Sequence, residues 1–364
     1  MNCDAARIAA CFDNPGGKVT LGIDGFVDEV WQVISVRKSE NDFTLFNKMR
    51  DFAKAVYDCG EGGYANEIIH KRRSYGGFTA NTGKAVGRLG IDTTLLGLFG
   101  HKTVDPVFED FSDFCRFVSA GNPGRCQIFE FLDGKLMLPY VEEITRINWA
   151  YLVDTMSVEK LGALFLDADI VGLGYWSQLR YFDELVAKLC EHFLLPGKCS
   201  RLFFDLADIR KRDKHALLNT LQSLTVLGKK IPMTVSLNEH EAERLFSYMG
   251  RDFAWDKPDN ADKDIDYVRR QTGLDELIVH TPYFAVASTA TEGTVVRCQR
   301  YCENPVITTG AGDNFNGGYV AASACQDKLS LAERLAVGNA VTGFYVTNGY
   351  SPNKTELIDF IGGE

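Results

Sequence analysis

Short apolar runs rich in β-branched residues alternate along the chain with longer segments of helical period. Because segments of helical period separate the short runs, the pattern is typical of βα units and a mainly parallel sheet. The expected strands are residues 18–24, 93–100, 169–175, 201–207, 233–238 and 276–281. In such folds the ligand-binding residues lie at the edge of the sheet.

The segments of helical period predict helices that follow or separate these strands. The expected helices include residues 41–58, 80–90, 105–118, 182–194, 214–224 and 331–348. The fold class predicted from this order is α/β, a three-layer sandwich with a mainly parallel central sheet flanked by helices.

Two stretches interrupt the rhythm, at residues 30–38 and 126–140. The second is interpreted as two strands joined by Asp133-Gly134, a dipeptide favoured in hairpin turns. We interpret both stretches as parts of a small antiparallel β flap, with segments at about 28–40 and 125–142, inserted in a single domain that spans residues 1–364. The polar, turn-rich stretch 250–266 predicts a surface loop.

Composition and charge narrow the class of partner. The formal charge of −10 disfavours binding to the anionic backbone of nucleic acids, so a small-molecule partner is expected. The first fifteen or so residues lack the apolar run of a signal peptide or a membrane anchor, so no membrane partner and a cytoplasmic location are expected. The ten cysteines form no CxxC pair, and we expect reduced thiols.

The stretch VITTGAGDNFNGGYVAA, residues 306–322, places three small residues before an aspartate and an apolar, helix-like run. If the helix begins near Gly312, the backbone N–H groups there form an unobstructed anion cradle. Asp313 would then accept a proton from a hydroxyl group that attacks a phosphoryl group held by those amides. The alternative is that Asp313 is only a helix N-terminal carboxylate favoured by the helix dipole.

Two other phosphate-binding motifs do not fit the spacing. Phe315 stands where a dinucleotide-binding fingerprint needs its third glycine. Residues 77–85, GFTANTGKA, are one residue too long for a Walker loop and have Ala85 where that loop needs Ser or Thr.

Four stretches resemble motifs of one family, the ribokinase-like, or PfkB, carbohydrate kinases. TTGAGDNFNGG, residues 308–318, resembles the C-terminal signature of that family, and GGFTANTGKAVGRLG, residues 76–90, is similar to its N-terminal signature. TVSLNEHEAERLF, residues 234–246, resembles its Asn-x-x-Glu segment, and AVGNAV, residues 336–341, resembles part of a C-terminal helix. The four stretches stand in the correct order and together span nearly the whole chain.

The resemblance implies a catalytic centre and an ATP site. Asp313 would be the catalytic base, and the backbone of Gly310, Ala311, Gly312 and Asp313 the anion hole. The residues implied on the nucleotide side are Thr309, Asn238, Glu241 and Asn339, of which Asn238 and Glu241 would organise Mg²⁺ through water. Asn339 and the loop after Val279 would border the adenine. Asn238 and Glu241 also fit a helix cap and its capping-box partner, and both interpretations can hold at once.

The sugar side would be formed by Gly76, Gly77, Asn81 and a carboxylate after the first strand. Glycines let hydroxyl groups approach the backbone, and Asn and Asp offer the donors and acceptors that polyols require. Two carboxylates are available, Asp24 and Asp28, and we favour Asp28 for substrate contact. Either also fits a loop or capping aspartate.

The sequence departs from the family pattern in three places, of which one, Gly83 where an alanine is more usual, is a minor change. Ile307 stands where many members have an aspartate that helps bind a monovalent cation, which argues against a potassium cofactor. Pro282 and Ala285 replace glycines that are usual in the nucleotide loop, so the identity and affinity of the phosphate donor stay open. None of the three departures removes the base or the anion hole.

The basic run HKRRS, residues 70–74, lies just before the sugar loop. Such a run is more often a solvated face. If Lys71, Arg72 or Arg73 contacts the ligand, we expect the substrate to carry a carboxylate or a phosphate.

Our leading hypothesis is an ATP- and Mg²⁺-dependent kinase that phosphorylates a hydroxyl group of a sugar or sugar-like molecule, with a flap that closes to exclude water. One alternative is a nucleoside kinase. Another is a sugar-binding protein of the same fold that has lost efficient phosphoryl transfer. The flap strands could also pair between two copies of the chain to form a homodimer.

Overall fold

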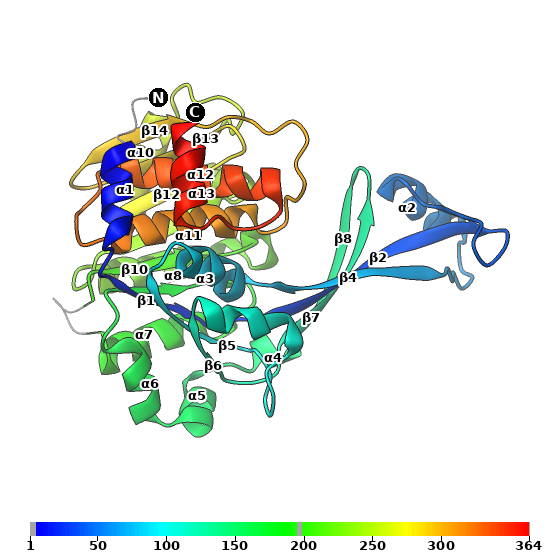
Figure 1. Ribbon diagram of the computed structural model, residues 1–364, viewed down its shortest axis with the longest axis horizontal. Coiled ribbons are helices and arrows are strands. Elements are labelled where there is room, and N and C mark those ends of the chain that lie inside the picture. The colour runs from blue at the N-terminus through cyan, green and yellow to red at the C-terminus, as the bar shows by residue number, and fades with distance from the viewer. Residues whose placement is uncertain (1–4, 195–198, 364) are drawn as a thin grey trace.

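Two sheets organise the part of the chain that the computed structural model describes, residues 5–194 and 199–363. The larger sheet has nine strands, in the order β14-β13-β12-β11-β10-β9-β1-β5-β6, and the smaller sheet has five. Figure 1 shows the larger sheet and its helices as a rounded body, from which the smaller sheet projects as a long arm.

The large sheet is parallel from β6 to β12, and β13 pairs antiparallel with both of its neighbours, β12 and β14. The predicted mainly parallel sheet is therefore confirmed, and the six predicted strands correspond to β1, β5, β9, β10, β11 and β12. The strands are β1 (Lys18–Gly22), β5 (Asp92–Gly97), β6 (Arg116–Ser119), β9 (Ile170–Leu173), β10 (Arg201–Asp205), β11 (Met233–Asn238), β12 (Glu276–His280), β13 (Phe284–Thr289) and β14 (Gly293–Cys298).

Helices cover both faces of this sheet, and each face has its own buried cluster. Alternate strand residues point to opposite faces. In β10, Leu202 and Phe204 pack in one cluster and Phe203 packs in the other. The helices of the Phe203 face are α1 (Ala5–Asp13), α3 (Phe78–Arg88), α11 (Ala311–Ala324), α12 (Leu331–Asn348) and α13 (Lys354–Gly362). Those of the opposite face are α5 (Trp149–Met156), α6 (Val158–Phe165), α7 (Phe182–His192), α8 (Lys214–Gly228), α9 (Glu239–Tyr248) and α10 (Ala261–Thr272).

The small sheet forms the flap, and its central strand is β2. It contains β2 (Phe26–Arg37), β3 (Phe43–Leu45), β4 (Ile68–Gly76), β7 (Gly124–Phe131) and β8 (Gly134–Tyr140). β2 pairs antiparallel with β4 but parallel with β7. The expectation of a purely antiparallel flap is therefore wrong. β7 and β8 form the predicted hairpin, which turns between Phe131 and Gly134. The helix α2 (Met49–Asp58) lies beside the hairpin at the far end of the arm (Figure 1).

Three predicted segments differ from the structure. Residues 41–58 are helical only from Met49, because residues 43–45 pair with β2 as a short edge strand. Residues 105–118 form a 3₁₀ helix, η1 (Pro106–Asp113), and then enter β6. Phe108 and Phe111 are buried three residues apart, a spacing that a 3₁₀ helix fits as well as an α-helix. The expected loop 250–266 becomes helical at Ala261, and two short helices remain, α4 (Glu142–Thr145) and η2 (Ile209–Lys211).

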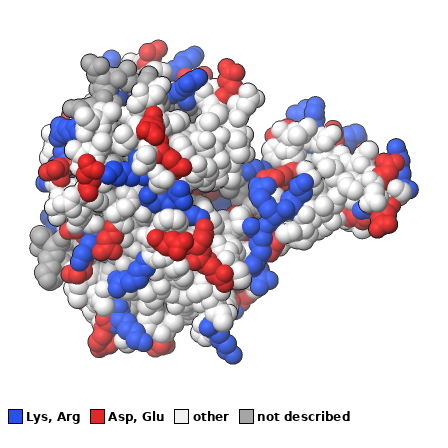
Figure 2. All heavy atoms as spheres, in the orientation of Figure 1, with Lys and Arg blue, Asp and Glu red and all other residues white. Residues whose placement is uncertain are grey.

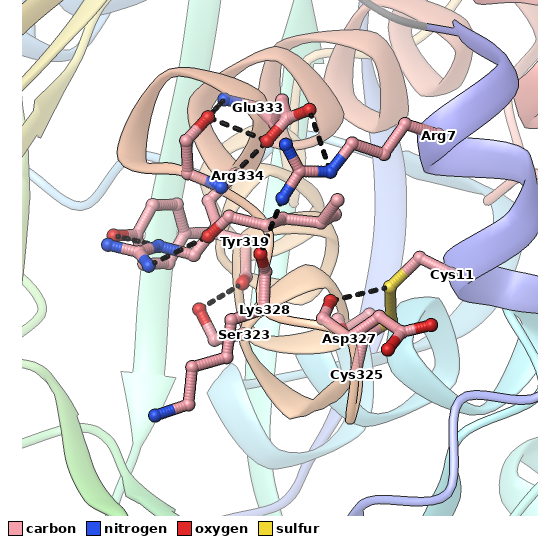
Figure 3. Close-up of a disulfide and its surroundings, with 12 residues drawn as sticks. Arg7, Cys11, Tyr319, Ser323, Cys325, Asp327, Lys328, Glu333 and Arg334 are labelled. Atoms are coloured by element: carbon pink, nitrogen blue, oxygen red, sulfur yellow. Dashed lines mark hydrogen bonds and ion pairs between the residues drawn. A yellow bond between two sulfur atoms is a disulfide. The ribbon is translucent and has the colours of Figure 1, made fainter.

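A disulfide joins Cys11 of α1 to Cys325 at the end of α11, with the two Cα atoms 6.0 Å apart (Figure 3). The expectation of reduced thiols is therefore wrong for this pair, whose separation of 314 residues gave no signal in the sequence. Arg7 of α1 also lies 3.5 Å from the Glu333 carboxylate of α12 (Figure 3), so α1 is fastened to the layer that carries α11. Seven other described cysteines are free, and Cys3 lies outside the described residues.

None of the described helices combines the length and the apolar character that a membrane crossing requires.

Candidate active site

The motif at residues 306–322 lies at the start of α11, where the chain turns into the helix. Gly310 has a φ of 83°, a left-handed conformation that glycine adopts without strain, and the helix begins at Ala311. Asp313 lies in the first turn, and its Oδ2 accepts a hydrogen bond from Asn81 Nδ2 of α3 at 2.9 Å. The fold thus brings together a residue of the N-terminal signature and one of the C-terminal signature.

Two backbone N–H groups at this helix start are available to an anion. Among the described residues, neither the Gly312 nor the Asp313 N–H group has a protein acceptor, whereas the Ala311 N–H group donates to the Thr308 carbonyl oxygen at 3.2 Å. The Ala311 N–H group, which the sequence predicted as part of the anion hole, is therefore not available to an anion. A Cβ atom at Gly312 would lie 2.9 Å from His280 Cε1, so a larger residue would crowd this wall of the cradle.

The Asp313 carboxylate lies in an acidic setting. Desolvation raises the pKa of Asp313 well above its ordinary value, the negative charge of Asp205 raises it further, and the hydrogen bond from Asn81 opposes the rise. Asp205 ends β10 and accepts hydrogen bonds from Asn316 Nδ2 and the Ala207 N–H group, each at 2.7 Å. A carboxylate with a raised pKa accepts a proton more readily than a surface aspartate does.

A cavity of about 390 Å³ lies beside the cradle, lined among others by Asn238, His280, Gln299 and Gly312. In the described part of the chain, Gln299 Oε1 of this lining is buried without a hydrogen-bond partner, as are Asn339 Oδ1 and Arg297 Nε, whose residues do not line the cavity. Asn339 lies beside β14, because its Nδ2 donates a hydrogen bond to the Arg297 carbonyl oxygen of that strand at 3.1 Å. An unpaired acceptor at a largely apolar cavity fits the polar edge of a planar base such as adenine.

Asn238 and Glu241 form the expected capping box at the start of α9. Asn238 Oδ1 accepts from the Glu241 N–H group and Glu241 Oε2 accepts from the Asn238 N–H group, both at 3.0 Å. Desolvation and the charge of Asp205 raise the pKa of Glu241 well above its ordinary value. The described residues contain no group of three or more acidic, His or Cys side chains arranged to hold a metal.

The two candidate carboxylates of the sugar side have different surroundings. Both oxygens of Asp24 serve the start of α3, accepting from the N–H groups of Phe78 at 2.8 Å and Thr79 at 2.7 Å. Asp28 lies in β2, is only 6% exposed, and receives no hydrogen bond from any described residue. Desolvation raises the pKa of Asp28 to about 6, and the charges of Lys135 and Arg72 oppose that rise. Asp24 therefore acts as a helix cap, whereas the Asp28 carboxylate is unpaired.

Gly76 and Gly77 allow these carboxylates to approach the backbone. A Cβ atom at Gly76 would lie 2.6 Å from Asp28 Oδ2, and one at Gly77 would lie 2.5 Å from Asp24 Oδ2. Gly77 also has a φ of 97° at the N-cap of α3. Any side chain at either position would therefore displace one of these carboxylates.

Tyr175 is a site residue that the sequence did not indicate. It follows β9 with a φ of 62°, which is unusual for a residue with a side chain. Desolvation raises the pKa of Tyr175 well above its ordinary value, and four carboxylates add to the rise: Asp24, Asp313, Asp28 and Asp205. The negative charges of all four carboxylates therefore act on this one phenol group.

The flap faces the body across a second cavity of about 640 Å³, lined among others by Arg72, Glu130, Lys135 and Thr308. Lys135 Nζ donates a hydrogen bond to Thr309 Oγ1, one residue before the glycine turn. Figure 2 shows basic side chains gathered where the flap joins the body. This contact between flap and cradle was also missed, although the sequence predicted the hairpin that carries Lys135.

The basic run at residues 70–74 lies in β4 rather than in a loop. Arg72 pairs with Glu130 through two hydrogen bonds, at 2.6 and 3.0 Å, and Arg73 Nη2 pairs with Asp105 at 2.7 Å. Of Lys71, Arg72 and Arg73, only Arg72 lines the cavity under the flap. Contact between this run and a substrate stays a prediction.

The fold combines a mainly parallel sheet with a β flap, and Asp313 lies beside free backbone N–H groups at the start of α11. These features together define a ribokinase-like carbohydrate kinase. The fold is shared with the Arabidopsis thaliana ribokinase complexed with ribose and ATP, at a TM-score of 0.62 and 16% identity, covering 95% of this chain and 98% of that one. It is also shared with the Xylella fastidiosa fructokinase with bound ATP, at a TM-score of 0.61 and 17% identity, with 95% and 98% covered.

The sequence identifies a narrower family. The prokaryotic ketohexokinase family matches residues 3–363. The ketohexokinase of Haloferax volcanii is 30% identical over 356 residues, which cover 96% of this chain and 92% of that protein. The chain therefore belongs to the prokaryotic ketohexokinase family, and the PfkB resemblance and the enzyme class predicted from its motifs are confirmed.

Proposed function

We propose that the protein transfers the γ-phosphoryl group of ATP to a hydroxyl group of a ketohexose. The observation that carries this proposal is the pairing of Asp313 with Asn81 beside the free N–H groups of Gly312 and Asp313. A base and an anion cradle on one helix turn suit phosphoryl transfer to an alcohol. The kind of sugar is taken from the family to which the chain belongs.

In the proposed reaction, the acceptor hydroxyl group gives its proton to the Asp313 carboxylate as its oxygen forms a bond to the γ-phosphorus. The bond between that phosphorus and the β,γ-bridging oxygen breaks, and ADP leaves with the electron pair. Negative charge on the transferred group faces the N–H groups of Gly312 and Asp313. Mg²⁺, when bound through water near Asn238 and Glu241, supplies charge neutralisation on the phosphates.

ATP would lie with its adenine toward Asn339 and Gln299 and its phosphates toward the start of α11. The unpaired polar atoms of those two residues support this direction. Thr309 would border the phosphates, since it directly precedes the glycine turn. Its carbonyl oxygen accepts a hydrogen bond from Tyr345 at 2.7 Å, which holds the backbone before Gly310 in place.

The sugar would bind on the other side of Asp313, between the flap and α3. The unpaired Asp28 carboxylate would accept hydrogen bonds from sugar hydroxyl groups, and Gly76 and Gly77 would leave room for them. Closure of the flap over the sugar would exclude water, which competes as a nucleophile.

We also propose that two copies of the chain associate through their flaps. The flap exposes large apolar side chains, with exposed fractions of 85% for Leu132, 52% for Leu138 and 57% for Tyr140. Burying them against a second flap would remove this apolar surface from water. Sedimentation velocity would show a dimer that Leu138→Asp converts to a monomer, and a wild-type monomer at all concentrations would contradict the proposal.

A turnover screen with ATP and Mg²⁺ tests the proposed reaction. The acceptors would be ketohexoses, aldohexoses, pentoses and nucleosides. Preferred turnover of a ketohexose is expected. Preferred turnover of a nucleoside would support the alternative acceptor class, and binding of sugars by calorimetry without any turnover would support a binding protein.

A further inference from the structure

Lys135 connects the flap to the start of the anion cradle. It follows Gly134 at the hairpin turn, and its Nζ donates to Thr309 Oγ1 across the cavity between flap and body. Thr309 directly precedes Gly310, whose left-handed turn starts the cradle. The ammonium group therefore lies at the edge of the space in which the proposed reaction moves a phosphoryl group.

The far end of the flap holds this hairpin in position. The Leu132 N–H group donates to the Asn47 carbonyl oxygen at 2.7 Å, and the Asp133 carboxylate accepts from the Met49 N–H group at 2.6 Å. The ring of Phe52 in α2 stacks on Phe131 of β7 at 5.7 Å between centroids. Through these contacts, α2 and the residues before it support the hairpin turn next to Lys135.

The charges near Lys135 form a network of two cations, Lys135 and Arg72, and two carboxylates, Glu130 and Asp28. Lys135 Nζ lies 3.8 Å from the Glu130 carboxylate, which Arg72 already engages through two hydrogen bonds. The side chain of Lys135 is 26% exposed, so it is partly buried but still accessible to solvent. An ammonium group held by a neutral hydroxyl group and a shared carboxylate is free to exchange toward a stronger anion.

We propose that Lys135 is a catalytic residue, whose ammonium group moves from Thr309 Oγ1 to an equatorial oxygen of the phosphoryl group during transfer. The inference rests on the proposed function. Lys135 forms no covalent bond: the acceptor oxygen bonds to phosphorus, ADP leaves with the electron pair of the broken bond, and Asp313 takes the proton. Lys135 stabilises the charge that spreads over the equatorial oxygens.

A simpler role would be that of a latch that only keeps the flap closed. The two roles predict different kinetics. Loss of a latch would raise KM for the sugar and increase ATP hydrolysis by water. Loss of a group that contacts the transferring phosphoryl group would lower kcat with little effect on KM.

The test compares Lys135→Met, Lys135→Arg and the control Lys48→Met, which removes the charge of another exposed flap lysine. With D-fructose and ATP, we expect Lys135→Met to lower kcat by about 10²- to 10³-fold, the scale for removing one donor to a developing anion. Its KM for fructose should stay within about threefold. Lys135→Arg should recover about tenfold or more of the loss, and Lys48→Met should match the wild type.

A binding measurement gives a second readout. In the presence of fructose, Lys135→Met should bind Mg-ADP as the wild type does, but should lose about 10²-fold affinity for Mg-ADP with aluminium fluoride, which mimics the transferring group. Wild-type kcat in Lys135→Met, a change confined to KM, or unchanged aluminium fluoride affinity would each overturn the inference. An inactive wild type would instead contradict the proposed function, so the two failures are distinguishable.

Discussion

Asn81 Nδ2 lies 2.9 Å from Asp313 Oδ2, although 232 residues separate the two in the sequence. The donor comes from the first turns of α3 and the acceptor from the first turn of α11. The neighbouring Thr82 strengthens the same contact, because its Oγ1 donates to the Asp313 carbonyl oxygen at 3.2 Å. The two helix starts thus fix one carboxylate at the junction of the proposed sugar and ATP sites.

The surroundings of Asp24 and Asp28 predict opposite effects of removing each carboxylate. Asp28→Ala should raise KM for the sugar by about tenfold or more, because a buried hydrogen-bonding group on a ligand would lose its partner. Its thermal stability should not fall, since the wild-type carboxylate has no hydrogen bond from the described residues. Steady-state kinetics and a melting curve check both statements.

Asp24→Ala should instead destabilise the fold by about 1–2 kcal/mol, the scale for losing a helix N-cap. The N–H groups of Phe78 and Thr79 would be left without acceptors. Denaturant unfolding measures this change. A large rise in sugar KM with unchanged stability would show that Asp24, rather than Asp28, contacts the substrate.

The acid limb of the pH–rate profile should respond to the neighbours of Asp313. A base role for Asp313 requires the ionised carboxylate, so kcat/KM should then fall as the pH drops through the raised pKa of Asp313. Asp205→Asn removes a negative charge that raises this pKa, and the limb should move to lower pH. Asn81→Ala removes a hydrogen bond that lowers it, and the limb should move to higher pH. If the acid limb moved in the same direction in the two variants, the assignment of that limb to Asp313 would be contradicted.

Asn339 tests the direction of the nucleotide. Asn339→Leu should raise KM for ATP by about tenfold, because the polar edge of the base would lose a partner worth roughly 1–1.5 kcal/mol. KM for the sugar should not change, since Asn339 is linked to Arg297 of β14 rather than to the flap. Equal increases in both KM values would indicate a general loss of structure.

Ile307 predicts that turnover does not depend on potassium. Its side chain lines the cavity under the flap and offers no oxygen to a monovalent cation. Equal kcat values in potassium, sodium and choline chloride at constant ionic strength are expected. Several-fold activation by potassium alone would show that other groups supply the cation site.

The sequence predicted the parts of this site that depend on local chemistry. The glycine turn at Gly310 and the capping box at Asn238 follow from short-range rules, and the structure contains both. The parallel sheet followed from periodic apolar runs. The strand β4 escaped detection because residues 70–73 are all basic and lack the alternation that marks a strand.

The residues that the sequence missed depend on long-range packing. Tyr175 reaches the acidic cluster through a left-handed backbone turn that no sequence pattern requires. Lys135 reaches Thr309 only because the β7–β8 hairpin faces the segment before α11 across a cavity. The sequence favoured Asp28 over Asp24 for substrate contact, but it could not show that Asp24 caps α3, because helix capping and ligand contact favour the same residue type.

The most direct test of the account is the turnover of Asp313→Asn with the preferred sugar. The amide keeps the size of the side chain but cannot accept the proton. We expect kcat to fall by roughly 10²- to 10⁴-fold, while calorimetry shows sugar and Mg-ADP binding close to that of the wild type. A kcat near the wild-type value would contradict the central claim that Asp313 is the base.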